Sequence, residues 1–125
     1  MTPSDPPLPL LFSYSACSTC RKALAWLKQQ GIAVEVREIT STPPSRDQLA
    51  EAMAQLGRPR LFNTSGQSYR ALGAAAVKAL SDAQALDALA ADGKLIKRPF
   101  LITSAGTILT GFQVEEWQAL LAPAP

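Results

Sequence analysis

The sequence contains no histidine and only two cysteines among its 125 residues. Without histidine, the chain has no imidazole for acid–base catalysis and lacks a common zinc ligand. Cys17 and Cys20 are only three positions apart, so a disulfide between them cannot join distant parts of a fold. A chain of this length does not need a disulfide to fold. The cysteine pair therefore indicates metal or redox chemistry.

The net charge is small, and the apolar runs are short. The 12 basic and 10 acidic side chains leave a formal net charge of +2, far below the basic excess of a nucleic-acid-binding surface. No run approaches the roughly 18 apolar residues that span a membrane, and residues 1–7 lack the basic and apolar regions of a signal peptide. We therefore expect a protein that binds neither membranes nor nucleic acid directly. We expect it in the cytoplasm, where thiols stay reduced.

The remaining composition, with 47% hydrophobic and 18% charged residues, is typical of one soluble domain. We predict a Pro-rich N-terminal tail over residues 1–7, a single domain over residues 8–121, and a C-terminal tail over residues 122–125.

Apolar periodicity and capping residues predict the order of secondary structure. A strand, a helix and a half-buried strand within about 30 residues form a unit whose strands run parallel. Capping boxes at Ser45–Gln48 and Ser81–Gln84 open two further helices. The order predicts a thioredoxin-like α/β fold, a four-stranded mixed sheet flanked by helices with a helical insert. The expected ranges are strand 8–14, helix 19–30, strand 32–39, helix 45–57, an irregular segment 58–80 with a short helix at 69–72, helix 81–92, hairpin strands 99–102 and 107–110, and helix 113–121.

The Cys17-x-x-Cys20 segment places its first cysteine at the start of a predicted helix. Unpaired backbone N–H groups and the positive end of the helix dipole favour a thiolate there. Cysteines in such positions have pKa values of roughly 3.5 to 7.5 instead of about 8.5, and Arg21 adds positive potential. Cys20, one turn further, is close enough to attack an adduct on Cys17 and form a disulfide. We therefore predict Cys17 as the nucleophile and Cys20 as the resolving thiol.

Other interpretations of the cysteine pair explain less of the sequence. A structural zinc site needs four ligands, and the chain has no third cysteine and no histidine, so we predict no metal site. Two inert buried thiols are a common alternative, but a polar Ser18-Thr19 spacer at a helix start argues against it. A phosphatase-type loop would need arginine six positions after Cys17, where the chain has Ala23.

An arginine precedes the proline that opens the predicted hairpin. In thioredoxin-like folds a proline at the place of Pro99 is usually cis and packs opposite the cysteine motif, so Arg98 would face Cys17. Its planar guanidinium binds an oxyanion through two hydrogen bonds and lowers the pKa of a nearby thiol. The alternative is a solvated charge beside a strand.

Four segments, residues 14–23, 61–66, 95–99 and 111–117, resemble the arsenate reductase (ArsC) family of thioredoxin-like proteins. This family includes both ArsC-type enzymes and the Spx/MgsR regulators that bind RNA polymerase. The resemblance extends over residues 10–121 and does not choose between these branches.

The resemblance implies that Cys17 attacks arsenate and forms a thiol–arsenate adduct. A second thiol then reduces the adduct and releases arsenite, and Arg98 matches the arginine that holds the oxyanion. Glutathione supplies that thiol in glutaredoxin-coupled members. Here Cys20 is the candidate, leaving a disulfide for thioredoxin to reduce. We expect no bound cofactor, and an external thioredoxin or, failing that, glutathione with glutaredoxin.

The chain departs from the glutaredoxin-coupled members, which place three arginines around the anion. Asn63 and Gly111 stand at two of those places, and Arg60 and Arg70 are candidates to replace the missing charges. Residues 18 and 19 either donate hydrogen bonds or only build the turn. We predict substrate contacts from Ser18, Thr19, Arg21, Arg60 and Asn63, with Pro99 supporting the site.

Three hypotheses about function follow from these residues. The first is an oxidoreductase that reduces arsenate, or a related oxyanion, and is coupled to thioredoxin. The second is a regulator whose Cys17–Cys20 disulfide switches contact with RNA polymerase. The third is a general thiol–disulfide oxidoreductase acting on protein substrates.

Overall fold

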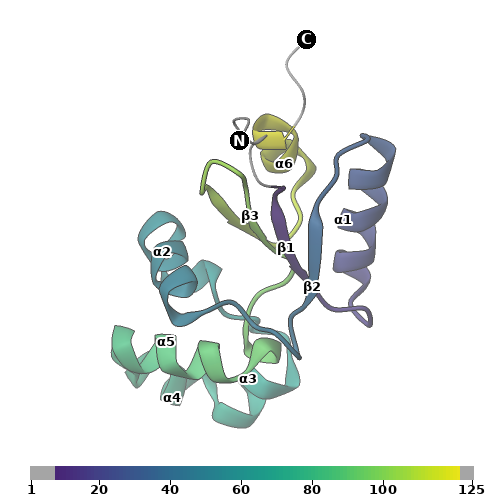
Figure 1. Ribbon diagram of the computed structural model, residues 1–125. Helices are drawn as coiled ribbons and strands as arrows, with labels where there is room; N and C mark the ends of the chain where they lie inside the picture. The colour runs from purple at the N-terminus through teal and green to yellow at the C-terminus, as the bar shows by residue number, and fades with distance from the viewer. Residues whose placement is uncertain (1–7, 122–125) are drawn as a thin grey trace.

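The first strand, helix and second strand form the unit expected from the sequence (Figure 1). The computed structural model describes residues 8–121, so the tails predicted over residues 1–7 and 122–125 lie outside the described residues. Strand β1 (Leu10–Ser13) pairs in parallel with β2 (Glu35–Glu38), and helix α1 (Ser18–Gln29) connects them. Leu11 and Phe12 have no exposed surface, because β1 lies between two other strands and is covered on both faces.

A hairpin completes the sheet on the other side of β1. Strand β3 (Phe100–Ile102) runs antiparallel to β1 and to β4 (Ile108–Thr110), so the sheet is mixed and has the order β2-β1-β3-β4. The peptide bond before Pro99 is cis. The thioredoxin-like arrangement predicted from the order of the elements is therefore confirmed.

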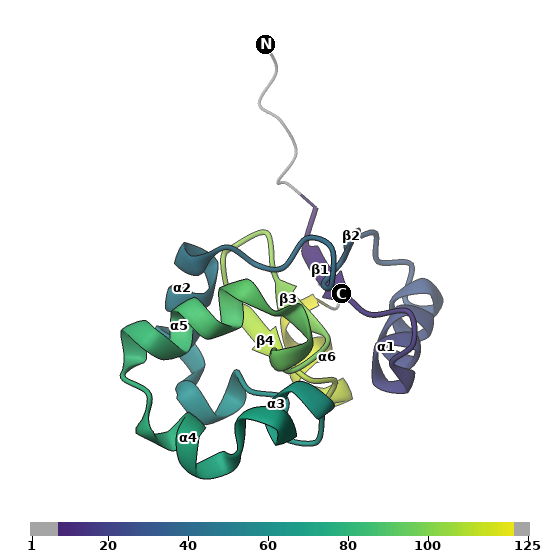
Figure 2. The ribbon, with the colours of Figure 1, turned by 90° about the horizontal axis from the view of Figure 1, so that it is seen from below.

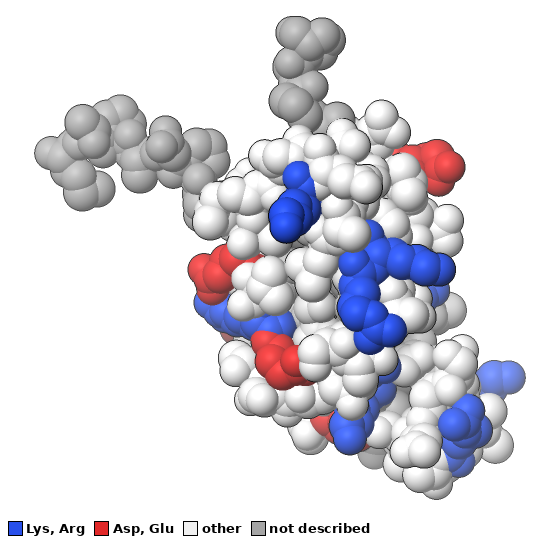
Figure 3. Space-filling view, turned by 90° about the vertical axis from the view of Figure 1, so that its right-hand side faces the viewer, with Lys and Arg blue, Asp and Glu red and all other residues white. Residues whose placement is uncertain are grey.

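The two faces of the sheet carry two hydrophobic cores. Successive strand residues point to opposite faces, so Leu11 packs against α1 and α6 (Val114–Leu121), while Phe12 packs against the helical insert. Trp117 on α6 is fully buried in the first of these cores. Figure 2 shows the insert on one side of the sheet and α1 on the other. No helix among the described residues is long and apolar enough to cross a membrane. On the face of the molecule drawn in Figure 3, basic and acidic side chains are both present among uncharged residues.

Two helices of the insert begin with the capping interactions expected from the sequence. The Ser45 and Gln48 pair opens α2, and the Ser81 and Gln84 pair opens α5, each with both reciprocal hydrogen bonds. These interactions satisfy N–H groups that have no partner within the helix. The elements of the insert are α2 (Arg46–Leu56), the 3₁₀ turn η1 (Arg58–Arg60), α3 (Gln67–Leu72), α4 (Ala74–Ala79), α5 (Asp82–Ala91) and η2 (Gly93–Leu95).

Two expectations about the elements were wrong. The sequence predicts irregular structure over residues 74–79, but these residues form α4, which Gly73 at a positive φ of 86° separates from α3. Alanine has the highest helix propensity, and this segment is rich in it. The second strand is shorter than predicted and lies at the sheet edge. It buries neither face, and Val36 is 50% exposed, whereas the alternating pattern predicted one buried face.

Replacing Gly93 by alanine is expected to lower the free energy of unfolding by about 2–3 kcal/mol. A Cβ at this position would collide with the backbone carbonyl oxygen of Ile39, which cannot move aside as a flexible side chain can. Urea denaturation measures the change. Gly106→Ala is the control, since its added Cβ meets no atom within 4 Å and only its positive φ of 91° is unfavourable. Equal losses of stability in the two variants would contradict the prediction.

Candidate functional site

Cys17 is the N-cap residue of α1, and Cys20 lies in the first turn. A tight turn precedes the helix. In this turn the backbone N–H of Cys17 donates to the carbonyl of Tyr14 at 2.9 Å. The backbone of Cys17 is extended, while its carbonyl accepts from the N–H of Arg21 at 3.1 Å. The Cys17 side chain is partly exposed, whereas Cys20 is fully buried. The helix start predicted from the sequence thus gives the two thiols different environments.

The environment of Cys17 favours its thiolate. Partial burial by itself raises the pKa, but the backbone N–H and thiol of Cys20 and the guanidinium of Arg98 outweigh it. The pKa of Cys17 is therefore lowered from its ordinary value of 9.0. No acidic side chain lies in the first turn of α1 to oppose the effect.

The environment of Cys20 favours its neutral thiol. Burial raises the pKa of Cys20 to about 11, and the neighbouring Cys17 also raises it. The backbone N–H of Tyr14 donates to the Cys20 sulfur at 3.4 Å but does not offset the burial. Near neutral pH the pair therefore holds one activated thiol in contact with one protonated thiol.

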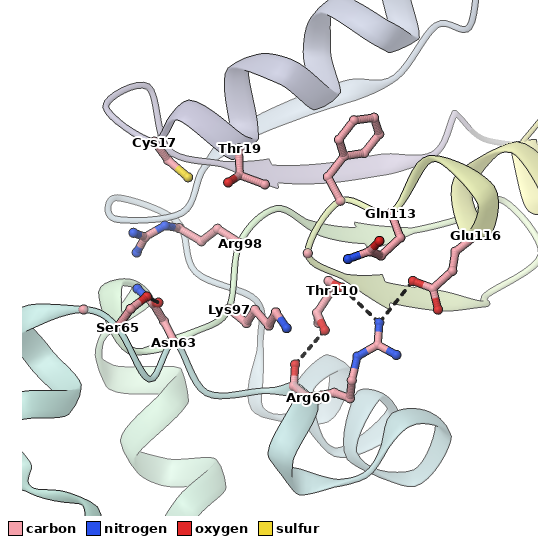
Figure 4. A pocket seen from close by; sticks show the side chains of 13 residues that line it. Cys17, Thr19, Arg60, Asn63, Ser65, Lys97, Arg98, Thr110, Gln113 and Glu116 are labelled. Carbon is pink, nitrogen blue, oxygen red and sulfur yellow. Dashed lines mark hydrogen bonds and ion pairs between the residues drawn. The ribbon is translucent and has the colours of Figure 1, made fainter.

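Cys17 opens into a pocket of about 680 Å³ between the helix start, the insert and the end of the hairpin (Figure 4). Most of its walls come from segments distant in sequence, which only the fold brings together. The lining residues are Cys17, Thr19, Arg60, Asn63, Ser65, Gly66, Lys97, Arg98, Thr110, Gly111, Phe112, Gln113 and Glu116.

Arg98 lies at the Cys17 end of this pocket, as expected from the position of Pro99. Its guanidinium carbon lies 4.9 Å from the centre of the Tyr14 ring, and one terminal nitrogen donates to the carbonyl of Lys94 at 3.3 Å. Its Nε is buried, and among the described residues it has no hydrogen-bond partner. These contacts hold the guanidinium beside the thiol, with donor capacity left for an anion.

The other predicted contacts divide into two groups. Thr19, Asn63 and Arg60 line the pocket. Ser18 and Arg21 do not, because Ser18 is exposed on α1 and Arg21 turns away to donate to the carbonyl of Ser15 at 2.8 Å. The structure therefore brings together three of the five residues expected to contact substrate.

Arg60 lies at the opposite end of the pocket from Cys17 (Figure 4). One of its terminal nitrogens donates to the Thr110 carbonyl at 3.1 Å and to the Glu116 carboxylate at 3.3 Å. The Thr110 hydroxyl in turn donates to the Arg60 carbonyl at 2.6 Å. Arg60 thus joins the insert to the hairpin, and its charge is largely balanced by Glu116. The other candidate, Arg70, donates to the Ser65 carbonyl and does not line the pocket.

Comparison with known proteins identifies the family of this chain. The model of the ArsC family matches residues 12–120. The chain belongs to the ArsC family. It is 36% identical over 108 residues to the uncharacterised protein YusI of Bacillus subtilis, covering 84% of this chain and 91% of YusI. The solved structure of a possible arsenate reductase from Streptococcus mutans superposes with a TM-score of 0.81 at 36% identity, covering 90% of this chain and 98% of that one.

A regulator is also among the relatives of this ArsC-family chain. The global transcriptional regulator Spx of Streptococcus pyogenes serotype M3 is 29% identical over 114 residues. The alignment covers 90% of this chain and 84% of the regulator. Family membership therefore leaves the choice between an enzyme and a regulator to the site itself.

Sequence reasoning missed several pocket residues of this ArsC-family chain. Lys97 and Glu116 lie in segments that carried the family resemblance, but their side chains were not assigned to the site. No local signal indicated Thr110 or Gln113, which reach the pocket because the hairpin ends beside α6.

Near neutral pH, iodoacetamide is expected to alkylate Cys17 at least about tenfold faster than Cys20, because only a thiolate is an efficient nucleophile. Cys17 has the lowered pKa and partial exposure, whereas Cys20 is buried with a pKa of about 11. Mass spectrometry after peptide digestion measures the two rates. The Cys17 rate should rise with pH and level off below pH 9.0, its ordinary pKa. Equal labelling of the folded protein's two thiols would contradict the assignment of roles.

Proposed function

We propose that this protein is a thiol-dependent oxidoreductase that reduces arsenate to arsenite and is regenerated by thioredoxin. The observation that carries the proposal is the Cys17 thiol with its lowered pKa, flanked by Arg98 in a pocket and backed by the buried thiol of Cys20. A nucleophile, an anion-binding cation and a resolving thiol are the parts that this reaction needs. We also propose that the protein acts in the cytoplasm, where a reduced cysteine pair is maintained.

In the first step the Cys17 thiolate attacks the arsenic atom of arsenate. A sulfur–arsenic bond forms, and one arsenate oxygen leaves as water after taking up protons. The arsenic remains As(V) in this adduct. Arg98 binds oxygens of the bound anion, and the free N–H groups at the start of α1 face the same negative charge.

In the second step the Cys20 sulfur attacks the Cys17 sulfur. A disulfide forms as the sulfur–arsenic bond breaks, and its electron pair reduces arsenic to As(III), which leaves as arsenite. The Cys17 thiolate is one cause of the raised pKa of Cys20. Adduct formation removes the charge from the Cys17 sulfur itself, which weakens this contribution to the pKa of Cys20. Two thiols of thioredoxin then reduce the disulfide and become oxidised themselves.

A coupled assay tests the proposal directly. Thioredoxin, thioredoxin reductase and NADPH are combined with the protein, and arsenate is expected to drive NADPH oxidation. Replacing that system by glutathione, glutaredoxin and glutathione reductase is expected to give slower turnover, because Cys20 already supplies an internal resolving thiol. Absence of arsenate-dependent turnover in both systems would show the proposal to be wrong, and reduction of a protein disulfide instead would favour a general oxidoreductase.

The similarity to Spx supports a second candidate, a redox-sensing regulator that binds RNA polymerase. In this case formation of the Cys17–Cys20 disulfide would alter a protein-binding surface instead of completing a catalytic cycle. Pull-down of purified RNA polymerase α subunit with the reduced and oxidised protein tests it. Redox-dependent binding without arsenate turnover would favour the regulator over the enzyme.

A further inference from the structure

Lys97 is a cation of the pocket lining that has no role in the two proposed steps. It lines the same pocket as Cys17 and Arg98 and is partly buried. Within residues 8–121 its ammonium forms no ion pair and no hydrogen bond, whereas the guanidinium of Arg60 is paired with Glu116. Figure 4 shows the Lys97 side chain between Arg98 and Arg60. An ammonium with no protein partner that lines a pocket leaves its three N–H donors available to an anion.

Backbone pairing fixes the base of the Lys97 side chain. Its N–H donates to the Leu61 carbonyl at 2.8 Å, and the N–H of Asn63 donates to the Leu95 carbonyl at 2.8 Å. Phe62 and Ile96 form the bridge between these two bonds. The segment before Pro99 is thereby attached to the insert, and Lys97 starts from a fixed point on the pocket wall.

Gly111 provides the space that the Lys97 side chain occupies. A Cβ built on Gly111 would lie 3.0 Å from Lys97 Cε and 3.8 Å from Nζ. Gly111 itself is held on both sides, because its N–H donates to the Pro99 carbonyl at 2.9 Å and its carbonyl accepts from Trp117 Nε1 at 3.0 Å. Its φ of 72° also disfavours any other residue. The absence of a side chain at 111 therefore lets Lys97 lie across this part of the wall.

A second cation would offset negative charge that Arg98 and the start of α1 leave unbalanced in the pocket. A doubly charged tetrahedral oxyanion beside the Cys17 thiolate adds further negative charge, and Arg98 supplies only one positive charge. Arg60 already has Glu116 as an acidic partner at 3.3 Å, while its buried Nε has no hydrogen-bond partner among the described residues. Lys97 is therefore the remaining cation of the pocket lining that can offset the charge, and its flexible four-carbon chain lets the ammonium follow the anion.

We propose that Lys97 binds the oxyanion together with Arg98, and that Gly111 makes this possible by leaving room for the lysine. This assignment deepens the proposed arsenate reductase and rests on it for the identity of the anion. It predicts a site selective for doubly charged tetrahedral oxyanions over singly charged anions. Lys97 would thus determine anion affinity, while Cys17 and Cys20 determine the chemistry.

Protection of Cys17 from iodoacetamide by inorganic phosphate tests the proposal without turnover. Phosphate has the shape and charge of arsenate but is not reduced by thiols. At constant ionic strength, the phosphate concentration that halves the alkylation rate should rise about tenfold in Lys97→Met. It should change little in Lys97→Arg. Lys28→Met, which removes an exposed lysine at the far end of α1, should match the unmodified protein.

A second variant and a kinetic measurement distinguish a wrong assignment of Lys97 from a wrong proposal of arsenate reduction. Gly111→Ala should weaken phosphate protection less than Lys97→Met does, because its Cβ would lie 3.0 Å from Lys97 Cε and the flexible lysine needs to shift only slightly. Urea denaturation checks that both variants are folded. In the coupled assay Lys97→Met should raise the KM for arsenate more than it lowers kcat. Absence of phosphate protection, or equal protection in Lys97→Met, would overturn the lysine assignment even if arsenate is reduced. If phosphate protection depends on Lys97 but arsenate is not turned over, the proposed anion site is supported and the proposed reductase activity is contradicted.

Discussion

Cys17→Ser is expected to reduce arsenate-driven NADPH oxidation by at least about 10³-fold, to the level without protein. Serine keeps the size and turn geometry of the residue, but its hydroxyl does not ionise near neutral pH and cannot form the sulfur–arsenic bond. The N-cap position also accepts serine readily, so the fold should be preserved. Activity is measured in the thioredoxin-coupled assay, and circular dichroism verifies folding.

Cys20→Ser provides the matched control for this experiment. The variant keeps Cys17 and Arg98, so iodoacetamide should still label it and arsenate should still form the first adduct. It cannot form the internal disulfide, so turnover with thioredoxin should be lost. Glutathione with glutaredoxin is expected to restore part of it by supplying the second thiol. Arsenate turnover by Cys17→Ser, or full thioredoxin-dependent turnover by Cys20→Ser, would contradict the assigned roles.

Arg98→Ala is expected to lower kcat/KM for arsenate by about 10²- to 10³-fold, the usual effect of removing one donor that stabilises an oxyanion. The same substitution acts on the nucleophile, because Arg98 lowers the pKa of Cys17 through a hydrogen bond and through its charge. Without the guanidinium this pKa rises. The fraction of thiolate near neutral pH therefore falls, and the pH at which the alkylation rate levels off moves upward.

Arg98→Lys separates the charge from the geometry. Lysine keeps one positive charge but cannot form two parallel hydrogen bonds with an oxyanion. The variant should therefore retain much of the lowered pKa of Cys17 while arsenate kcat/KM stays well below that of the unmodified protein. Arg46→Ala, which removes an exposed arginine paired with Asp87 on the insert, is the control. An unchanged alkylation pH profile in Arg98→Ala would show that Arg98 does not act on the thiol.

The unequal thiols show how far local sequence can predict a site. Cys17 was expected at a helix start because turn residues precede it and helix-forming residues follow, and both signals are local. The difference in pKa between the two thiols depends on burial as well as on the helix start. Cys20 has a pKa of about 11 mainly because it is buried, and that burial depends on the packing of α1 against the sheet. Spacing alone predicted the order of attack but not the size of this difference.

The basic residues show the limit of such prediction more clearly. Arg21 is adjacent to the cysteine pair in sequence, yet it turns away to the Ser15 carbonyl. Arg60 and Lys97 are remote from Cys17 in sequence but line its pocket. Their local sequences carry no signal for this, because their positions follow from the pairing of residues 61–63 with residues 95–97.

The sequence by itself determined the cysteine pair, its place at a helix start, the order of the elements and the proline that follows Arg98. Each depends on local spacing, capping or turn chemistry, or on the fold that the order of the elements implies. The tertiary structure alone decided that Arg60 is balanced by Glu116, that Lys97 remains uncommitted, and that Cys20 is the buried thiol. Charge pairing and burial depend on which distant segments come into contact, and only tertiary packing determines those contacts.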